Sequence, residues 1–208
     1  MPQANTADEI FIVDDDPAIR SMLSIVLAKE GYEVVCFAEG GAFLAAAKAR
    51  SPACIILDVH IPGKSGLDIL RSLNAQDYPV PIFIMSGSGD IPMAVEAIKN
   101  GALDFIQKPF KGSEIVTRVK EALSAHAARS ANPALSLSLH FPGREPLSRR
   151  EQDVLACLAS GASNKLAARQ LGISPRTVEV HRARIMEKLG ARNATDLMRI
   201  VMSEGRPS

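Results

Sequence analysis

The sequence predicts an α/β domain with a doubly wound, five-stranded parallel sheet, followed by an all-α domain of four helices. In the first half of the 208-residue chain, short apolar runs alternate five times with amphipathic helical stretches. In the second half, apolar residues recur at helical spacing. A stretch with three prolines separates the halves, so we expect domains over 1–126 and 144–208 joined by a linker over 127–143.

The strands of the first domain are expected where short apolar runs lie between helical patterns, as in a sheet buried on both faces. Asp16 and Pro17 follow the first run and are typical of a helix start, with Asp16 as the N-cap. The predicted strands cover 9–13, 32–37, 53–57, 81–85 and 103–106. The predicted helices cover 17–30, 39–50, 65–74, 90–100 and 112–126.

Serine and glycine residues mark the helix ends expected in the second domain. The stretch LSRREQDVLACLASG, residues 147–161, carries an apolar face and ends at a glycine. A short helix capped by Ser163 follows, then a longer basic helix from an N-cap at Ser174 to Gly190, and a fourth near 193–203. A short helix, a tight turn and a longer basic helix predict a helix-turn-helix.

The linker contains the alternation LSLSLH, residues 135–140. Alternation of this kind is compatible with a strand. The surrounding prolines and small residues favour an extended tether instead.

Composition indicates a globular protein in which each domain can bury its own core, since 47% of residues are hydrophobic and 23% charged. We find neither an apolar run long enough to span a bilayer nor a basic-then-apolar start. A cytoplasmic location without membrane contact is therefore expected. Cys36, Cys54 and Cys157 lie far apart without ligand-like spacing, and the first two are expected to be buried thiols.

The net charge of +1 conceals an asymmetry between the halves. Residues 1–125 contain 16 Asp and Glu against 11 Lys and Arg, whereas residues 126–208 contain 7 against 13. An acidic first half and a basic second half predict different partners, and nucleic acid is the candidate for the basic half.

Polar residues follow four of the predicted strands: Asp14 and Asp15, Asp58, Ser86 and Lys108. In an open parallel sheet the ligand crevice lies at the carboxyl ends of the strands, so a flavodoxin-like strand order would bring these groups together. Carboxylate oxygens are the ligands that Mg²⁺ prefers. The sequence therefore predicts a Mg²⁺ site beside a hydroxyl and an ammonium group.

The long basic helix of the second domain has two distinct faces. Its stripe of Val178, His181, Ile185 and Leu189 is expected to pack inward, which makes His181 a core-edge residue rather than a metal ligand. The remaining positions, together with one at the start of the preceding helix, form the predicted DNA-contacting set: Lys165, Arg176, Thr177, Glu179, Val180, Arg182, Ala183, Arg184 and Lys188. Of these, Lys165, Arg182 and Lys188 suit phosphates. Helical periodicity and charge alone favour DNA but also leave open that this basic module binds an acidic protein instead.

The motifs of the first half resemble the receiver domains of bacterial response regulators over residues 8–126. The matching phrases are VDDD, LDVHIPGKSGLD, MSGSGD and QKPF. The resemblance implies that Asp58 accepts a phosphoryl group from a sensor histidine kinase. It also implies that Asp14, Asp15, Asp58 and the backbone carbonyl of His60 hold Mg²⁺. Ser86 and Lys108 would bind the phosphate oxygens, and no catalytic group beyond Asp58 and Lys108 is expected.

A haloacid-dehalogenase-type phosphatase also forms an aspartyl phosphate, and its DxD motif resembles Asp14-x-Asp16. That family places Thr or Val two residues after the second aspartate, where this chain has Ala18. Asp16 is also expected to cap a helix. The sequence therefore does not support a phosphatase, and the chain is not expected to be an enzyme beyond assisting phosphorylation and dephosphorylation of Asp58.

The phrases LSRREQDVL and GASNKLAARQLGISPRTVEVHRARIMEKL resemble the LuxR-type DNA-binding domain over about 147–203. Together with the receiver motifs they resemble the FixJ/NarL class of transcriptional regulators, in which the helix over 174–189 enters the major groove. The resemblance implies a phosphorylation-controlled transcription factor that binds double-stranded DNA, with RNA polymerase as a further candidate partner. A receiver-containing adaptor whose helical domain binds protein is the alternative.

Phosphorylation is expected to couple to self-association. The family resemblance implies that Phe105 swings inward after Ser86 moves towards the phosphoryl group. This motion would reshape the surface of residues 90–106, where Ile91, Met93 and Ala94 lie near Lys99 and Asp104. We expect this face to pair two receivers about a two-fold axis.

Overall fold

The computed structural model describes residues 9–76, 78–87, 91–131 and 139–207, and it divides the chain into two compact units. We call residues 1–123 the first unit and residues 124–208 the second unit. Along the described ranges, we find no helix with the length and apolar character needed to cross a membrane.

The first unit contains a five-stranded parallel sheet in the order β2-β1-β3-β4-β5, which confirms the predicted fold class. Val13 lies opposite Phe37 on one side and Leu57 on the other, so β1 sits between β2 and β3. The strands are β1 (Glu9–Val13), β2 (Glu33–Phe37), β3 (Cys54–Asp58), β4 (Ile82–Ser86) and β5 (Asp104–Gln107). Every residue of β1, β3 and β4 is buried, as expected for parallel strands covered on both faces.

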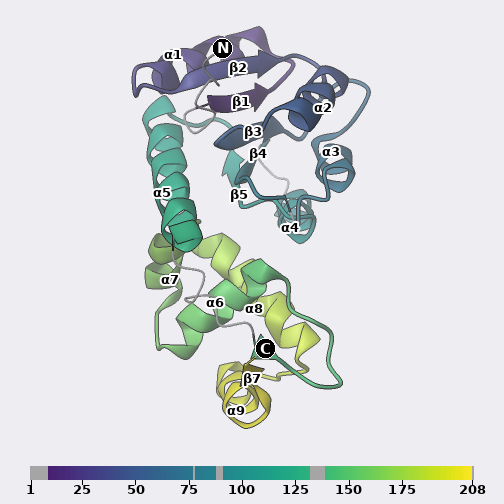
Figure 1. Cartoon of the computed structure of the whole chain (residues 1–208), viewed down its shortest axis with the longest axis vertical. Coiled ribbons are helices and arrows are strands. Elements are labelled where there is room, and N and C mark those ends of the chain that lie inside the picture. The colour runs from purple at the N-terminus through teal and green to yellow at the C-terminus, as the bar shows by residue number, and fades with distance from the viewer. Residues whose placement is uncertain (1–8, 77, 88–90, 132–138, 208) are drawn as a thin grey trace. The chain divides into compact units, whose positions relative to one another are not determined.

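Helices cover both faces of this sheet, with α1 and α5 on one side and α2, α3 and α4 on the other (Figure 1). The helices are α1 (Pro17–Ala28), α2 (Gly40–Ala49), α3 (Gly66–Ser72), α4 (Ile91–Lys99) and α5 (Gly112–Ala131). Asp16 caps α1 by accepting a hydrogen bond from the Ala18 amide, as predicted.

Two expectations about exposed segments require correction. Cys36 is exposed, because β2 is an edge strand of the sheet, whereas Cys54 on β3 is buried as expected. Helix α5 continues to Ala131, so the first five residues of the predicted linker are helical. Alanine and arginine in that stretch favour helix, and no glycine marks a stop.

The second unit contains the four expected helices: α6 (Arg149–Ala159), α7 (Asn164–Leu171), α8 (Pro175–Lys188) and α9 (Ala194–Glu204). Each begins after a polar N-cap that accepts a backbone hydrogen bond, and α6 and α7 both pack against α8. The LSLSLH stretch was expected to be a tether. Its last two residues instead form strand β6 (Leu139–His140), paired antiparallel with β7 (Arg206–Pro207), while residues 132–138 lie outside the described ranges.

Candidate phosphoacceptor site and DNA-contacting helix

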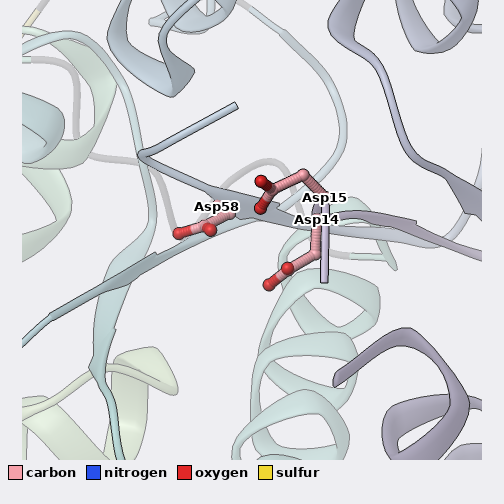
Figure 2. A group of neighbouring side chains, drawn as sticks. All are labelled: Asp14, Asp15 and Asp58. Carbon is pink, nitrogen blue, oxygen red and sulfur yellow. The ribbon is translucent and has the colours of Figure 1, made fainter. Parts of the chain in front are cut away.

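Three carboxylates meet at the carboxyl edge of the sheet in the first unit. Asp14 and Asp15 follow β1 directly, and Asp58 is the last residue of the neighbouring strand β3. One oxygen from each side chain lies within 4.8 Å of the other two (Figure 2). Asp14 and Asp58 are buried whereas Asp15 is exposed, so the cluster opens to solvent on one side.

Lys108 links the two buried carboxylates. Its Nζ donates hydrogen bonds of 2.9 Å to Asp14 Oδ2 and of 2.9 Å to Asp58 Oδ2. The residue follows β5, and its peptide N–H donates to the Ser86 carbonyl at the end of β4. The structure therefore brings together the strand-end acids and the ammonium group that the sequence predicted.

The charges of this cluster do not balance, since three carboxylates face one ammonium group. Burial raises the pKa of the Asp58 carboxyl and the Asp14 charge adds to that rise, while Lys108 and the His60 peptide N–H act against it. Burial lowers the pKa of Lys108, but its hydrogen bonds to Asp14 and Asp58 outweigh this, so its pKa is raised. The excess negative charge and the all-oxygen donor set fit a small divalent cation such as Mg²⁺.

Ser86 and Phe105 lie on β4 and β5, the two strands that come after β3 in the order of the sheet. Ser86 is buried one position after Met85, which lies opposite Asp58, and its hydroxyl donates to the Gly87 carbonyl at 3.3 Å. Phe105 is half-buried on β5, and its carbonyl accepts a hydrogen bond of 2.7 Å from Arg118 Nη1. Ser86 therefore lies at the carboxyl edge of the sheet, whereas Phe105 lies opposite Ile84, earlier along β5.

Two residues that support the acidic cluster were not predicted from the sequence. Arg20 Nη1 donates a 2.6 Å hydrogen bond to the carbonyl of Asp14, which ties α1 to the acidic turn. Gly66, the first residue of α3, lies against β3: a Cβ there would stand 2.4 Å from the Asp58 carbonyl oxygen. The Ser-Gly pair at this helix start was the available signal, because glycine is unfavourable in a helix unless space requires it.

The face expected to carry the dimer contact is only partly available. Ala94 and Asp104 are buried, and Asp104 forms an ion pair of 3.4 Å with Arg118. These two residues are therefore withdrawn from the predicted contact. Lys99 is exposed and Met93 is half-buried, whereas the side chain of Ile91 lies outside the described part of the structure.

Helix α8 presents the expected inward stripe in the second unit. Val178, His181, Ile185 and Leu189 are all buried. On the other side Arg176, Glu179 and Ala183 are exposed and Val180 and Arg182 are half-buried, while Lys165 is exposed at the start of α7. These outward residues are the part of the predicted DNA-contacting set that the structure leaves accessible.

Three members of the predicted DNA-contacting set are instead engaged within the domain. Thr177 is fully buried, and its hydroxyl lies 2.9 Å from the Ser174 hydroxyl at the N-cap of α8. Arg184 Nε lies 3.4 Å from Glu151, and Lys188 Nζ lies 2.9 Å from the same carboxylate. We therefore withdraw Thr177, Arg184 and Lys188 from the DNA-contacting set, because these positions have partners within the domain.

Glu151 on α6 is the buried acid that holds these two cations. It is 1% exposed, and its carboxylate accepts the Ser148 N–H in a capping box. Burial raises the pKa of Glu151, but the hydrogen bond and charge of Lys188, the Ser148 N–H and the Arg184 charge overcome this, so its pKa is lowered. The S-x-x-E pattern at 148–151 was visible in the sequence, whereas its partners on α8 were not.

His181 lies beside this carboxylate in the core of the second unit. Among the described residues, neither ring nitrogen has a hydrogen-bond partner. Burial lowers the pKa of His181 to about 4; the Glu151 charge opposes this effect and the Arg184 charge reinforces it. The imidazole is therefore neutral over the physiological pH range.

We expect the second unit to lose stability as the pH falls through this window. The unfolded imidazole takes up a proton near pH 6.5, whereas the buried ring stays neutral down to about pH 4, so protons favour the unfolded state between these values. The expected loss is on the order of 2–3 kcal/mol. Differential scanning calorimetry of the full chain would measure it, with His181→Leu as the comparison. An equal pH dependence in the variant would contradict the assignment to His181.

Comparison with known proteins assigns a family to each unit. The chain matches the response regulator receiver domain over residues 10–120 and the luxR family of bacterial regulatory proteins over residues 145–201. It is 40% identical to the transcriptional regulatory protein FixJ of Bradyrhizobium diazoefficiens over 202 residues, which covers 96% of this chain and 97% of that protein. It is 42% identical to the response regulator protein TodT of Pseudomonas putida over 199 residues, which covers 95% and 86%.

Solved structures agree with these matches. A crystal structure of full-length FixJ from B. japonicum is 39% identical, with a TM-score of 0.50 and coverage of 94% of this chain and 96% of that one. The receiver domain of NtrX from Brucella abortus is 36% identical, with a TM-score of 0.52 and coverage of 55% and 98%. The similarity to full-length relatives therefore spans both units.

Proposed function

Because the chain belongs to the response regulators that pair a receiver domain with a LuxR-type DNA-binding domain, it is a phosphorylation-controlled transcriptional regulator, and we propose that Asp58 is its phosphoacceptor. The observation that supports this residue is the position of its carboxylate at the end of β3, beside two further acids and 2.9 Å from the Lys108 ammonium group. The luxR-family match favours DNA over an acidic protein as the partner of the second unit.

The proposed donor is a phosphohistidine on a sensor histidine kinase. A carboxylate oxygen of Asp58 attacks the phosphorus, the P–N bond to the histidine breaks, and an acyl phosphate forms. The Lys108 ammonium group stabilises the negative charge on the phosphoryl oxygens, and the Ser86 hydroxyl is a further donor at the same edge of the sheet. Self-assisted hydrolysis of this acyl phosphate is the only enzymatic activity that we propose.

Mg²⁺ is the metal that this donor set fits. The residues that would hold it are Asp14, Asp15 and Asp58 through their carboxylates. Membership of the receiver family adds the backbone carbonyl of His60 to this proposed set. When bound, the ion neutralises charge on the transferring phosphoryl group and so lets a carboxylate approach it.

The proposed DNA-contacting set is now Lys165, Arg176, Glu179, Val180, Arg182 and Ala183. These positions are accessible, and the N-terminal part of a recognition helix is the part that meets base edges in helix-turn-helix proteins. The ligand is double-stranded promoter DNA in the cytoplasm, and RNA polymerase is the partner that we propose at a bound promoter.

Val180→Asn is expected to change the preferred DNA sequence. Val180 is half-exposed on the outward side of α8, and its apolar side chain suits a thymine methyl group, whereas asparagine favours adenine. Arg182→Ala is the matched variant on the same helix, and it should weaken binding to all sequences alike because it removes a phosphate contact. Selection from a random duplex pool with each protein would measure both effects. Retention of the wild-type sequence preference by Val180→Asn would contradict this orientation of α8.

We also propose that phosphorylated receivers form a homodimer through the accessible part of residues 90–106. Lys99 is exposed and Met93 is half-buried on α4, and Phe105 is half-buried on β5. Self-association of the receivers would bring two DNA-binding domains to half-sites about one helical turn apart.

Sedimentation velocity is expected to show a change from monomer to dimer when beryllofluoride, a phosphoryl mimic, is added. Phe105→Ala should reduce the dimer fraction at equal concentration, because the aromatic side chain can no longer signal from Asp58 to the surface. Lys120→Ala on α5 serves as the control. It removes an exposed ion pair with Glu30 and changes no residue of the proposed contact over 90–106. A mass that does not change with the mimic would rule out the dimer.

A further inference from the structure

The segment Leu139–Pro146, LHFPGREP, precedes α6 in the second unit, and we call it the clasp. Its first two residues pair with β7 next to the C-terminus, and Phe141 is buried. The Arg144 N–H donates to the Phe141 carbonyl at 3.2 Å, so the backbone turns here. The match to the luxR family begins only at residue 145, so most of the clasp lies before the region that the family defines.

Arg144 of the clasp bridges the ends of two helices. Its Nε and Nη2 donate to the two oxygens of Glu204, the last residue of α9, at 2.9 and 3.0 Å. Its Nη1 donates to the carbonyl of Leu189, which caps α8. Carbonyls at the C-terminal end of a helix lack intrahelical donors, and a cation there also interacts favourably with the helix dipole.

Gly190 forms the turn that follows the Leu189 carbonyl. The residue follows the C-cap of α8 with a φ of +62°, a conformation that glycine adopts without cost. A Cβ at this position would lie 3.4 Å from Arg144 Nη1. The turn therefore favours glycine here, while the guanidinium group lies at ordinary contact distance from it.

The same end of α8 is held from a second side by Lys188. Its Nζ donates to the Pro146 carbonyl of the clasp at 3.1 Å and lies 3.3 Å from the Glu145 carboxylate, besides its contact with buried Glu151. The clasp thus contacts the C-terminal end of α8 in two ways: Arg144 of the clasp binds a carbonyl of α8, and Lys188 of α8 binds a carbonyl of the clasp. The proposed DNA-contacting positions Arg176 to Ala183 occupy the earlier turns of this helix.

We propose that Arg144 is a positioning residue for sequence-selective DNA binding: it holds the C-terminal end of α8 and so sets the angle at which the earlier turns meet base edges. The inference rests on the proposed role of α8 in DNA contact. A helix rises about 1.5 Å per residue, so Ala183 lies only about 9 Å from the held end. A tilt about that end changes the direction of every exposed side chain on the helix. Base contacts depend on direction, whereas contacts to phosphates tolerate small shifts.

The test compares Arg144→Gln and Glu204→Gln in the full-length chain activated with beryllofluoride. Each removes one side of the same bridge, but the first lowers the net charge and the second raises it. If these residues acted only through charge, the two variants would shift DNA affinity in opposite directions. If they position α8, both lower the ratio of affinities for the selected duplex and for a scrambled duplex of equal length, by on the order of tenfold, the size of one mismatched base pair.

Arg199→Gln is the matched control, because Arg199 pairs with Asp196 within α9 and is 67% exposed. It should leave the affinity ratio unchanged. Circular dichroism melting establishes whether each variant is folded. Glu204→Gln keeps the Arg144 contact to Leu189, so it still tests the inference if Arg144→Gln fails to fold. A ratio within twofold of wild type for Glu204→Gln would overturn the inference. If the wild-type protein itself does not discriminate between the two duplexes, the proposed DNA contact by α8 fails instead.

Discussion

The Asp58→Asn protein is expected to take up no phosphoryl group from acetyl phosphate or phosphoramidate while keeping the fold of the first unit. The substitution preserves the size of the side chain but removes the charged nucleophilic oxygen. It also leaves the Lys108 contact with Asp14 in place. Intact-mass measurement after incubation with Mg²⁺ and the donor would detect the acyl phosphate on the wild-type chain and its absence from the variant.

Asp16→Asn is the matched control for this experiment. Asp16 belongs to the same run of three aspartates, but its side chain caps α1 and lies outside the carboxylate cluster. Asparagine is an equally good N-cap, so helix α1 should persist. Full labelling of the control with none on Asp58→Asn is the expected result. Full labelling of both would show that another residue accepts the phosphoryl group.

Glu151→Ala is expected to destabilise the second unit by about 3 kcal/mol, the usual cost of removing one partner from a buried ion pair. Glu151 is 1% exposed, and its loss removes the buried acid that lies beside Lys188 and Arg184, although Lys188 keeps its ion pair with the exposed Glu145. It also removes half of the capping box of α6. Glu151→Gln keeps the size of the side chain and isolates the effect of its charge.

Calorimetry of the full chain would measure this loss as a lower unfolding temperature for the second unit. Asp196→Ala is the comparison, because Asp196 occupies the corresponding first turn of α9 but pairs with the exposed Arg199. Its effect should be much smaller, since exposed ion pairs contribute little. Equal losses for both variants would show that burial of Glu151 does not matter.

The strands of the first unit were predictable to within one residue because each contains a short apolar run, which is continuous where the strand is buried on both faces, as in IFIV of β1. The strand-end acids were predictable for the same reason: once the strands are located, parallel pairing decides which residues share an edge. The end of α5 was not predictable, because no capping signal interrupts AARSA, residues 127–131. Where a helix made of strong helix formers ends depends on its tertiary contacts, which the sequence pattern does not give.

The ion pairs between α8 and α6 in the second unit could not be predicted from the sequence, for a different reason. Helical periodicity identified the buried stripe of α8 correctly. It predicts the direction in which a Cβ points, but not where the charged end of a long lysine or arginine side chain lies. Lys188 lies beside that stripe and bends back to Glu151, a residue 37 positions earlier. Contacts of that kind depend on how α6 crosses α8, which no local pattern contains.

The β6–β7 pairing has a consequence for how such regulators are assembled. The part of the second unit from residue 139 to residue 207 begins and ends on adjacent antiparallel strands, so the two ends of this module lie side by side. Modules whose ends meet tolerate insertion and exchange, because a host needs to supply only one attachment point. A gene fragment cut at residue 145 would separate these strands, whereas one cut before Leu139 would carry the closed module intact. Exchange of output modules between receivers, in evolution or in engineered sensors, should therefore favour junctions upstream of residue 139.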